Sequence, residues 1–71
     1  MKPLPFREVK RKLEAAGFTE AGQTGSHVKF AKSTAAGTLT ATVPRHNEVA
    51  AGTLRSILRQ AGLSAQEFEL L

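Results

Sequence analysis

The chain has 71 residues, and ten Lys and Arg against six acidic residues give it a net charge of +4. This length leaves room for one domain, residues 1–71, with a thin core, so we expect function to lie on a surface rather than in a deep pocket. Cysteine is absent, which excludes disulfide frameworks and thiolate zinc sites. No segment resembles a signal peptide or a membrane span, so a soluble cytoplasmic protein without a membrane partner is expected. The excess of positive charge favours nucleic acid as a partner.

The N-terminal part of the chain predicts an amphipathic helix that ends at Gly17, because glycine readily adopts the left-handed conformation of a helix C-terminus. The face expected to be buried has apolar residues at three- and four-residue steps: Phe6, Val9, Leu13 and Ala16. Another face is mostly basic, and Lys10 and Arg11 on it are candidate RNA contacts. The same charges also suit an ordinary solvated helix surface, since Glu8 and Lys12 have the favourable i, i+4 spacing.

Three strands are predicted next, over residues 18–23, 26–32 and 38–43. Turn-forming residues separate them at 24–25 and 33–37. An antiparallel meander is the simplest arrangement of three strands joined by such short connections.

Alternation along these strands predicts two different sheet faces, because side chains two residues apart share a face. Val28 and Phe30 point to one side, and His27 and Lys29 point to the other. The third strand alternates between an apolar row and a hydroxyl row: Leu39, Ala41 and Val43 against Thr38, Thr40 and Thr42. Helices should cover the apolar side, which leaves His27 and Lys29 beside threonines on an open face.

A second helix is predicted to start near Gly52 or Thr53 and to stop at Gly62. Its exposed residues Arg55 and Arg59 suit either a DNA contact or an ordinary helix surface. The residues expected to face inward are Leu54, Ile57, Leu58 and Ala61.

A short final helix is predicted after Gly62. Ser64 and Glu67 have the spacing of a capping box, in which each side chain accepts the other residue's backbone N–H. Leu63 and Phe68 have the spacing of the hydrophobic staple that accompanies it. The predicted fold class is therefore α+β, in the α-β-β-β-α order of the double-stranded-RNA-binding fold. It has a three-stranded antiparallel sheet with helices on one face, plus the short C-terminal helix.

Three sequence segments, taken in order, resemble those of a known protein family. They are residues 25–30 (GSHVKF), 43–46 (VPRH) and 52–64 (GTLRSILRQAGLS). In this order and spacing they resemble the HicA family of toxin–antitoxin systems, and the resemblance covers nearly the whole chain. One difference is that residues 47–51 contain no cation, whereas many members of the family have a longer, more basic stretch there.

The resemblance implies a double-stranded-RNA-binding-like fold that cleaves single-stranded messenger RNA, with His27 of the Gly-Ser-His motif as the catalytic residue. It also implies a HicB antitoxin partner that covers the active surface within a hetero-oligomeric complex. Operator DNA would then be contacted through the antitoxin. No cofactor is implied.

The chemistry of RNA cleavage is compatible with these residues. Attack by a 2′-hydroxyl requires a base, an acid and positive charge near the phosphorus. Histidine can perform either proton transfer close to neutral pH, and Lys29 on the same strand face is well placed to contact the scissile phosphate. Metal-dependent hydrolysis is the competing chemistry, but it requires clustered carboxylates or imidazoles. All six acidic residues are scattered glutamates, so no metal site is predicted.

Ser26 and His46 are possible supporting residues of the cleavage site. No acidic residue is placed to complete a triad with Ser26 and His27, so a phosphate or strand-end contact is favoured for the serine. His46 lies in a loop, where a second proton transfer, a phosphate contact and a solvated position are all compatible with the sequence. The other predicted RNA contacts are Lys32 and Arg45.

Two other functions remain open. In a non-catalytic RNA-binding module of the same fold, His27 and Lys29 would only contact phosphates, and His27→Ala would change affinity alone. In a subunit that binds DNA or protein through its helices, Arg55 and Arg59 would be essential and the open sheet face would not.

Overall fold

The computed structural model describes residues 1–71 and contains three helices and one sheet. Along the chain the elements are α1 (Phe6–Ala15), β1 (Thr19–Thr24), β2 (His27–Thr34), β3 (Gly37–Pro44), α2 (Ala51–Ala61) and α3 (Ala65–Glu69). The predicted α+β class, the α-β-β-β-α order and the short C-terminal helix are confirmed. None of the helices combines the length and the apolar character that crossing a bilayer requires.

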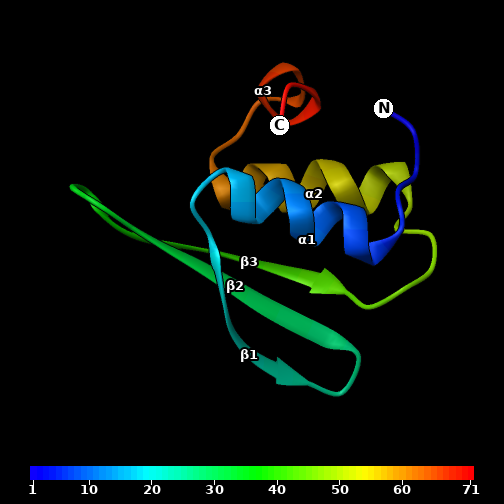
Figure 1. Cartoon of the computed structure of the whole chain (residues 1–71), viewed down its shortest axis with the longest axis horizontal. Coiled ribbons are helices and arrows are strands. Elements are labelled where there is room, and N and C mark those ends of the chain that lie inside the picture. The colour runs from blue at the N-terminus through cyan, green and yellow to red at the C-terminus, as the bar shows by residue number, and fades with distance from the viewer.

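The elements are arranged in layers (Figure 1). The sheet has the order β1-β2-β3, so β2 is its central strand, and both neighbouring pairs are antiparallel. Helices α1 and α2 lie on the same side of the sheet and both contribute residues to the core, and α3 lies beyond them, away from the sheet (Figure 1). The other face of the sheet is covered by no element, and we call it the open face.

The register of the sheet determines which residues share the open face. His27 is opposite Thr24 of β1 and Pro44 of β3, and Lys29 is opposite Thr42. Directly opposite residues point to the same side of an antiparallel pair. The predicted row of threonines beside His27 and Lys29 is therefore confirmed.

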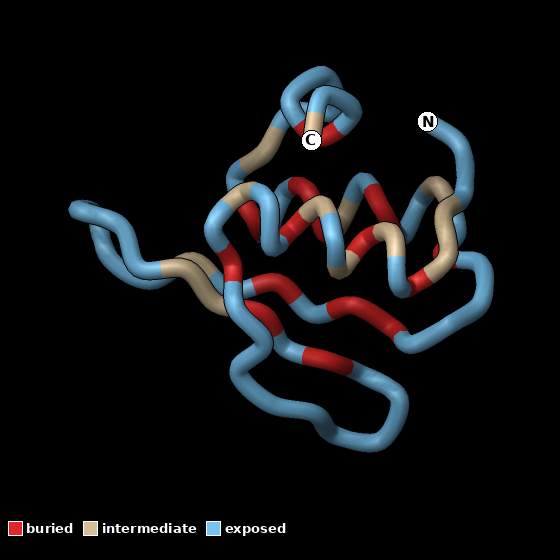
Figure 2. The backbone as a smooth tube through the Cα atoms, in the orientation of Figure 1, coloured by how far each residue is buried: buried red, intermediate tan, exposed pale blue.

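The core fills the space between the sheet and the helices α1 and α2 and continues beyond these helices to α3 through Phe68, as the buried segments in Figure 2 show. Phe30, at the middle of β2, is 0% exposed, and its ring centroid lies 6.3 Å from that of Phe6. Ala16 and Leu39, which the pattern places on buried faces, are only half-buried at the margin of this core. The residues of the core cluster are Phe6, Val9, Leu13, Phe18, Val28, Phe30, Ala41, Val43, Val49, Leu54, Ile57, Leu58, Ala61 and Phe68.

The β2–β3 hairpin is longer than the sequence predicts. A loop over residues 33–37 was expected, but pairing continues to Thr34 and Gly37, so only Ala35 and Ala36 form the turn. The Thr34 hydroxyl donates to the Gly37 carbonyl (2.6 Å) and accepts from the Ala36 N–H (3.2 Å). Gly37 has φ 125°, a conformation that favours glycine. The hairpin extends beyond the helices as an exposed arm (Figures 1 and 2).

The helix boundaries agree with the predicted end signals to within two residues. Helix α1 ends at Ala15, two residues before Gly17, and α2 is closed by Gly62 in the left-handed conformation (φ 70°). Helix α2 begins at Ala51, slightly earlier than predicted. Just before it, Val49 and Leu4 form an antiparallel bridge that ties the N-terminal segment to the loop between β3 and α2.

Helix α3 begins with the predicted capping box. The Ser64 hydroxyl accepts the Glu67 N–H (3.0 Å), and the Glu67 carboxylate accepts the Ser64 N–H (2.8 Å). Hydrogen bonds from the backbone and side chain of Ser64 lower the pKa of Glu67 below its ordinary value of 4.5. A carboxyl group with a lowered folded-state pKa stabilises the fold above its ordinary pKa, and this stabilisation is lost as the pH falls through the lowered value.

We therefore expect Glu67→Gln to reduce the loss of stability on acidification below about pH 4.5, because glutamine keeps the capping geometry and does not titrate. Urea denaturation from pH 7 to pH 3 measures this. Glu69→Gln on the same helix is the matched control and should follow the wild-type profile. Identical pH profiles for the two variants would contradict the assignment.

Candidate functional site

His27 is the first residue of β2 and is exposed at one end of the open face. The tight turn before it contains Gly25, with φ 59°, and Ser26. The Arg45 N–H donates to the Ser26 carbonyl at 2.6 Å, which ties this turn to the residue that follows β3. Since Pro44 is also paired with His27, the backbone around the imidazole is held from both neighbouring strands.

The open face combines one imidazole, one ammonium and a row of hydroxyls. Lys29 lies two residues after His27 on this face, is exposed, and forms no ion pair within the chain. The only acidic residue in the three strands, Glu20, is opposite Phe30 and therefore points to the helix side. Its carboxylate lies 3.2 Å from Lys10 Nζ. The open face thus carries positive charge and no acidic residue. Its other residues are Thr19, Gly22, Thr24, Ala31, Ser33, Thr38, Thr40, Thr42 and Pro44, of which Pro44 is buried.

Two observations concern the alternative mechanisms, which are a serine nucleophile and a bound metal ion. Ser26 is exposed in the turn before β2. No group of three or more His, Cys, Asp or Glu side chains is gathered anywhere in the molecule. The residues opposite His27 on the open face are Thr24 and Pro44, and Lys29 follows it on the same strand face.

Three of the predicted RNA contacts have partners on the helix side of the sheet. Lys10 is held by the ion pair with β1 described above, and Arg11 Nε donates to Glu8 Oε1 at 2.7 Å. Lys32 shares its row with Phe30, so it points away from the open face. Its ammonium donates to the Ala16 carbonyl (2.7 Å) just beyond the end of α1. These cations are not brought together with the imidazole.

The spacing of Glu8 and Lys12 predicts an ion pair that does not form. Lys12 Nζ instead donates to the carbonyls of Phe68 (3.0 Å) and Leu71 (3.2 Å), and it lies 5.2 Å from the centroid of the Phe68 ring. The lysine therefore fixes the C-terminal segment against α1. Glu8 pairs with Arg11, and the hydrogen bond from this guanidinium lowers the pKa of Glu8.

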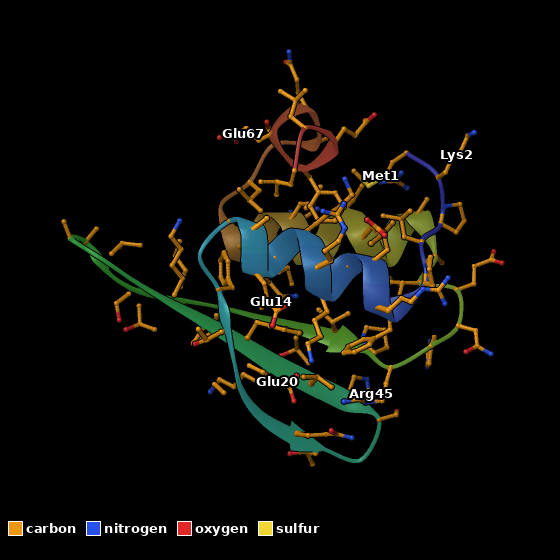
Figure 3. All side chains as sticks on the ribbon, in the orientation of Figure 1. Met1, Lys2, Glu14, Glu20, Arg45 and Glu67 are labelled. Atoms are coloured by element: carbon orange, nitrogen blue, oxygen red, sulfur yellow. The ribbon has the colours of Figure 1, made fainter.

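Arg45 and His46 line a hollow of 220 Å³ at the start of α1, which is separate from the open face. The Arg45 guanidinium carbon is 4.6 Å from the centroid of the Phe6 ring, and Nη2 donates to Gln23 Oε1 at 3.3 Å. Figure 3 shows Arg45 near the end of the sheet. The hollow is lined by Pro5, Phe6, Arg7, Arg45, His46 and Asn47.

A family model described as HicA toxin of bacterial toxin-antitoxin matches residues 6–63, from the start of α1 to just beyond α2. The chain belongs to the HicA toxin family. The resemblance carried by GSHVKF, VPRH and residues 52–64 is thereby confirmed, and helix α3 lies outside the matched part. No curated protein matches the chain. As a member of the HicA toxin family it belongs to a toxin–antitoxin system, which implies an antitoxin partner.

In this HicA-family chain the predicted site residues fall into three groups. Ser26, His27 and Lys29 lie together on or beside the open face. Arg45 and His46 line the hollow, and the remaining cations bind partners on the helix side. Sequence reasoning missed Arg7 as a member of the hollow, because the pattern shows it only as one exposed cation of a helix.

Proposed function

We propose that this HicA-family chain cleaves messenger RNA endonucleolytically on its open face, with His27 as the general acid/base. A HicB-type antitoxin neutralises it. The observation that supports this proposal most is the placement of His27 and Lys29, both exposed, on one face of the sheet without any carboxylate. A core role explains neither side chain, because the core lies on the other side of β2.

In the proposed reaction the RNA supplies its own nucleophile. His27 accepts the proton of a 2′-hydroxyl, the O2′–P bond forms, and the P–O5′ bond breaks. Water protonates the leaving 5′-oxygen, so the products carry a 2′,3′-cyclic phosphate and a 5′-hydroxyl. Lys29 stabilises the negative charge that develops on the non-bridging oxygens, and as a point charge it tolerates some variation in phosphate position.

The open face suits contact with a sugar-phosphate backbone more than the reading of bases. Its threonine hydroxyls can donate to phosphate oxygens, and none of its residues is aromatic. All four phenylalanines are in the core instead. Because stacking platforms normally orient unpaired bases, we expect cleavage with weak sequence preference.

The same face provides the surface on which the antitoxin acts. An antitoxin that covers His27 and Lys29 blocks the approach of RNA. Since the face has no acidic residue, an acidic patch on the antitoxin complements it.

Incubation of the purified protein with a defined single-stranded RNA in EDTA tests the cleavage mechanism. We expect cleavage to continue under chelation, because both proton transfers use an imidazole or water. End mapping should find 2′,3′-cyclic phosphates and 5′-hydroxyls. Loss of cleavage in EDTA that magnesium restores would contradict the mechanism, and RNA binding without any cleavage would favour the non-catalytic alternative.

A further inference from the structure

We infer that the hollow at the start of α1 binds a second phosphate of the RNA strand, through Arg7, Arg45 and His46. This inference rests on the proposed function. It extends that function because it adds an RNA-binding contact outside the open face. The established family membership does not assign this hollow to any ligand.

The charge of the hollow favours an anionic ligand. Two of its six lining residues are arginines and a third is a histidine, and none is acidic. Neither arginine forms an ion pair within the chain. Glu48 lies in a neighbouring depression that also contains Arg7, but Lys2 lies there too and balances its charge. The Arg7 guanidinium, which is exposed and makes no hydrogen bond, is therefore available to a ligand.

Contacts within the chain also fix the residues that line the hollow, so the site does not depend on a ligand to form. Contact with the Phe6 ring and the hydrogen bond to Gln23 hold the Arg45 guanidinium in place, so less side-chain freedom is lost when it binds an anion. The Phe6 N–H donates to the His46 carbonyl at 3.0 Å, which joins the first residue of α1 to the loop that carries the histidine. Such preorganised donors bind an anion at a lower entropic cost.

The hollow lies next to the catalytic end of the open face. Arg45 directly follows Pro44, which is paired with His27, and the Arg45 N–H donates to the Ser26 carbonyl. The Arg45 guanidinium itself lies on the helix side, over Phe6 and hydrogen-bonded to Gln23, which is opposite Val28. An RNA strand that leaves the imidazole and passes around this end of the sheet therefore comes to the Arg45 guanidinium. The planar guanidinium forms paired hydrogen bonds with phosphate oxygens, which makes a phosphodiester the fitting ligand.

The test uses His27→Ala protein, which should bind a single-stranded RNA oligonucleotide without cutting it. Adding Arg7→Gln should weaken binding several-fold. It should also make the dependence of log affinity on log salt concentration less steep by about 0.7, the value for one lost phosphate contact on single-stranded nucleic acid. Arg59→Gln, on the exposed side of α2, is the matched control and should change neither quantity.

Equal affinities and salt slopes for Arg7→Gln and Arg59→Gln would overturn the inference, while RNA cleavage by the wild-type protein would still support the proposed function. Weaker antitoxin binding by Arg7→Gln with unchanged RNA affinity would also overturn it, and would assign the hollow to an acidic segment of the antitoxin. Failure of the proposed function has a different signature, since the wild-type protein would then leave RNA intact.

Discussion

Replacing His27 with alanine should slow RNA cleavage by about 10²- to 10⁴-fold, the usual contribution of one positioned acid–base group. Growth arrest caused by expression of the toxin alone should disappear with it. Stability should change by less than about 0.5 kcal/mol, because the imidazole is exposed and lies outside the core. Cleavage of a defined RNA and urea denaturation, measured on the same preparation, check both parts.

Ser33→Ala is the matched control for this substitution. Ser33 lies on the same face of β2, near the far end of the strand, and is also exposed. It should keep full cleavage activity. If the His27→Ala protein cut RNA at the wild-type rate, His27 would have no part in the chemistry and the proposed mechanism would be wrong.

Replacing Phe30 with alanine should have the largest effect on stability. Phe30 is 0% exposed at the centre of the sheet, and truncation of a buried phenylalanine typically costs about 3–5 kcal/mol. The whole unfolding free energy of a chain with 71 residues is about 4–10 kcal/mol. We therefore expect Phe30→Ala to remove a large part of the stability and to lower the midpoint of thermal unfolding by at least about 10 °C, as circular dichroism would show.

The adjacent residue of the same strand provides the comparison. Lys29 points to the open face, so Lys29→Ala should leave stability within about 0.5 kcal/mol of wild type and should lower cleavage activity. Phe30→Leu keeps most of the apolar volume and should fall between the two in stability. Equal destabilisation by Lys29→Ala and Phe30→Ala would show that the two faces of β2 are wrongly assigned.

The parts of the fold that depend on local patterns were predictable. Alternation in β2 placed Phe30 in the core and Lys29 on the open face, and Gly62 marked the end of α2. The spacing of Ser64 and Glu67 identified the capping box. Each of these signals acts over a few residues and is decided by backbone geometry, so tertiary structure did not override it.

The contacts that define the hollow were not predictable in this way. Arg7 and Arg45 are far apart in the sequence, and they line one hollow because the Phe6–His46 main-chain hydrogen bond and the Leu4–Val49 bridge join the two segments. Lys32 shows a related effect. Its position in β2 places its side chain on the same face as the core residues, although lysine is charged. Its long apolar stem lets the ammonium reach the Ala16 carbonyl near the end of α1.

The central position of β2 links the proposed cleavage surface to the correct pairing of the sheet. If β2 slipped by one residue against its neighbours, every side chain would change sides, so Phe30 would enter solvent and the imidazole would turn toward the helices. A toxin with this register error would thus be inactive, and RNA cleavage would indicate that the middle strand is paired in its native register.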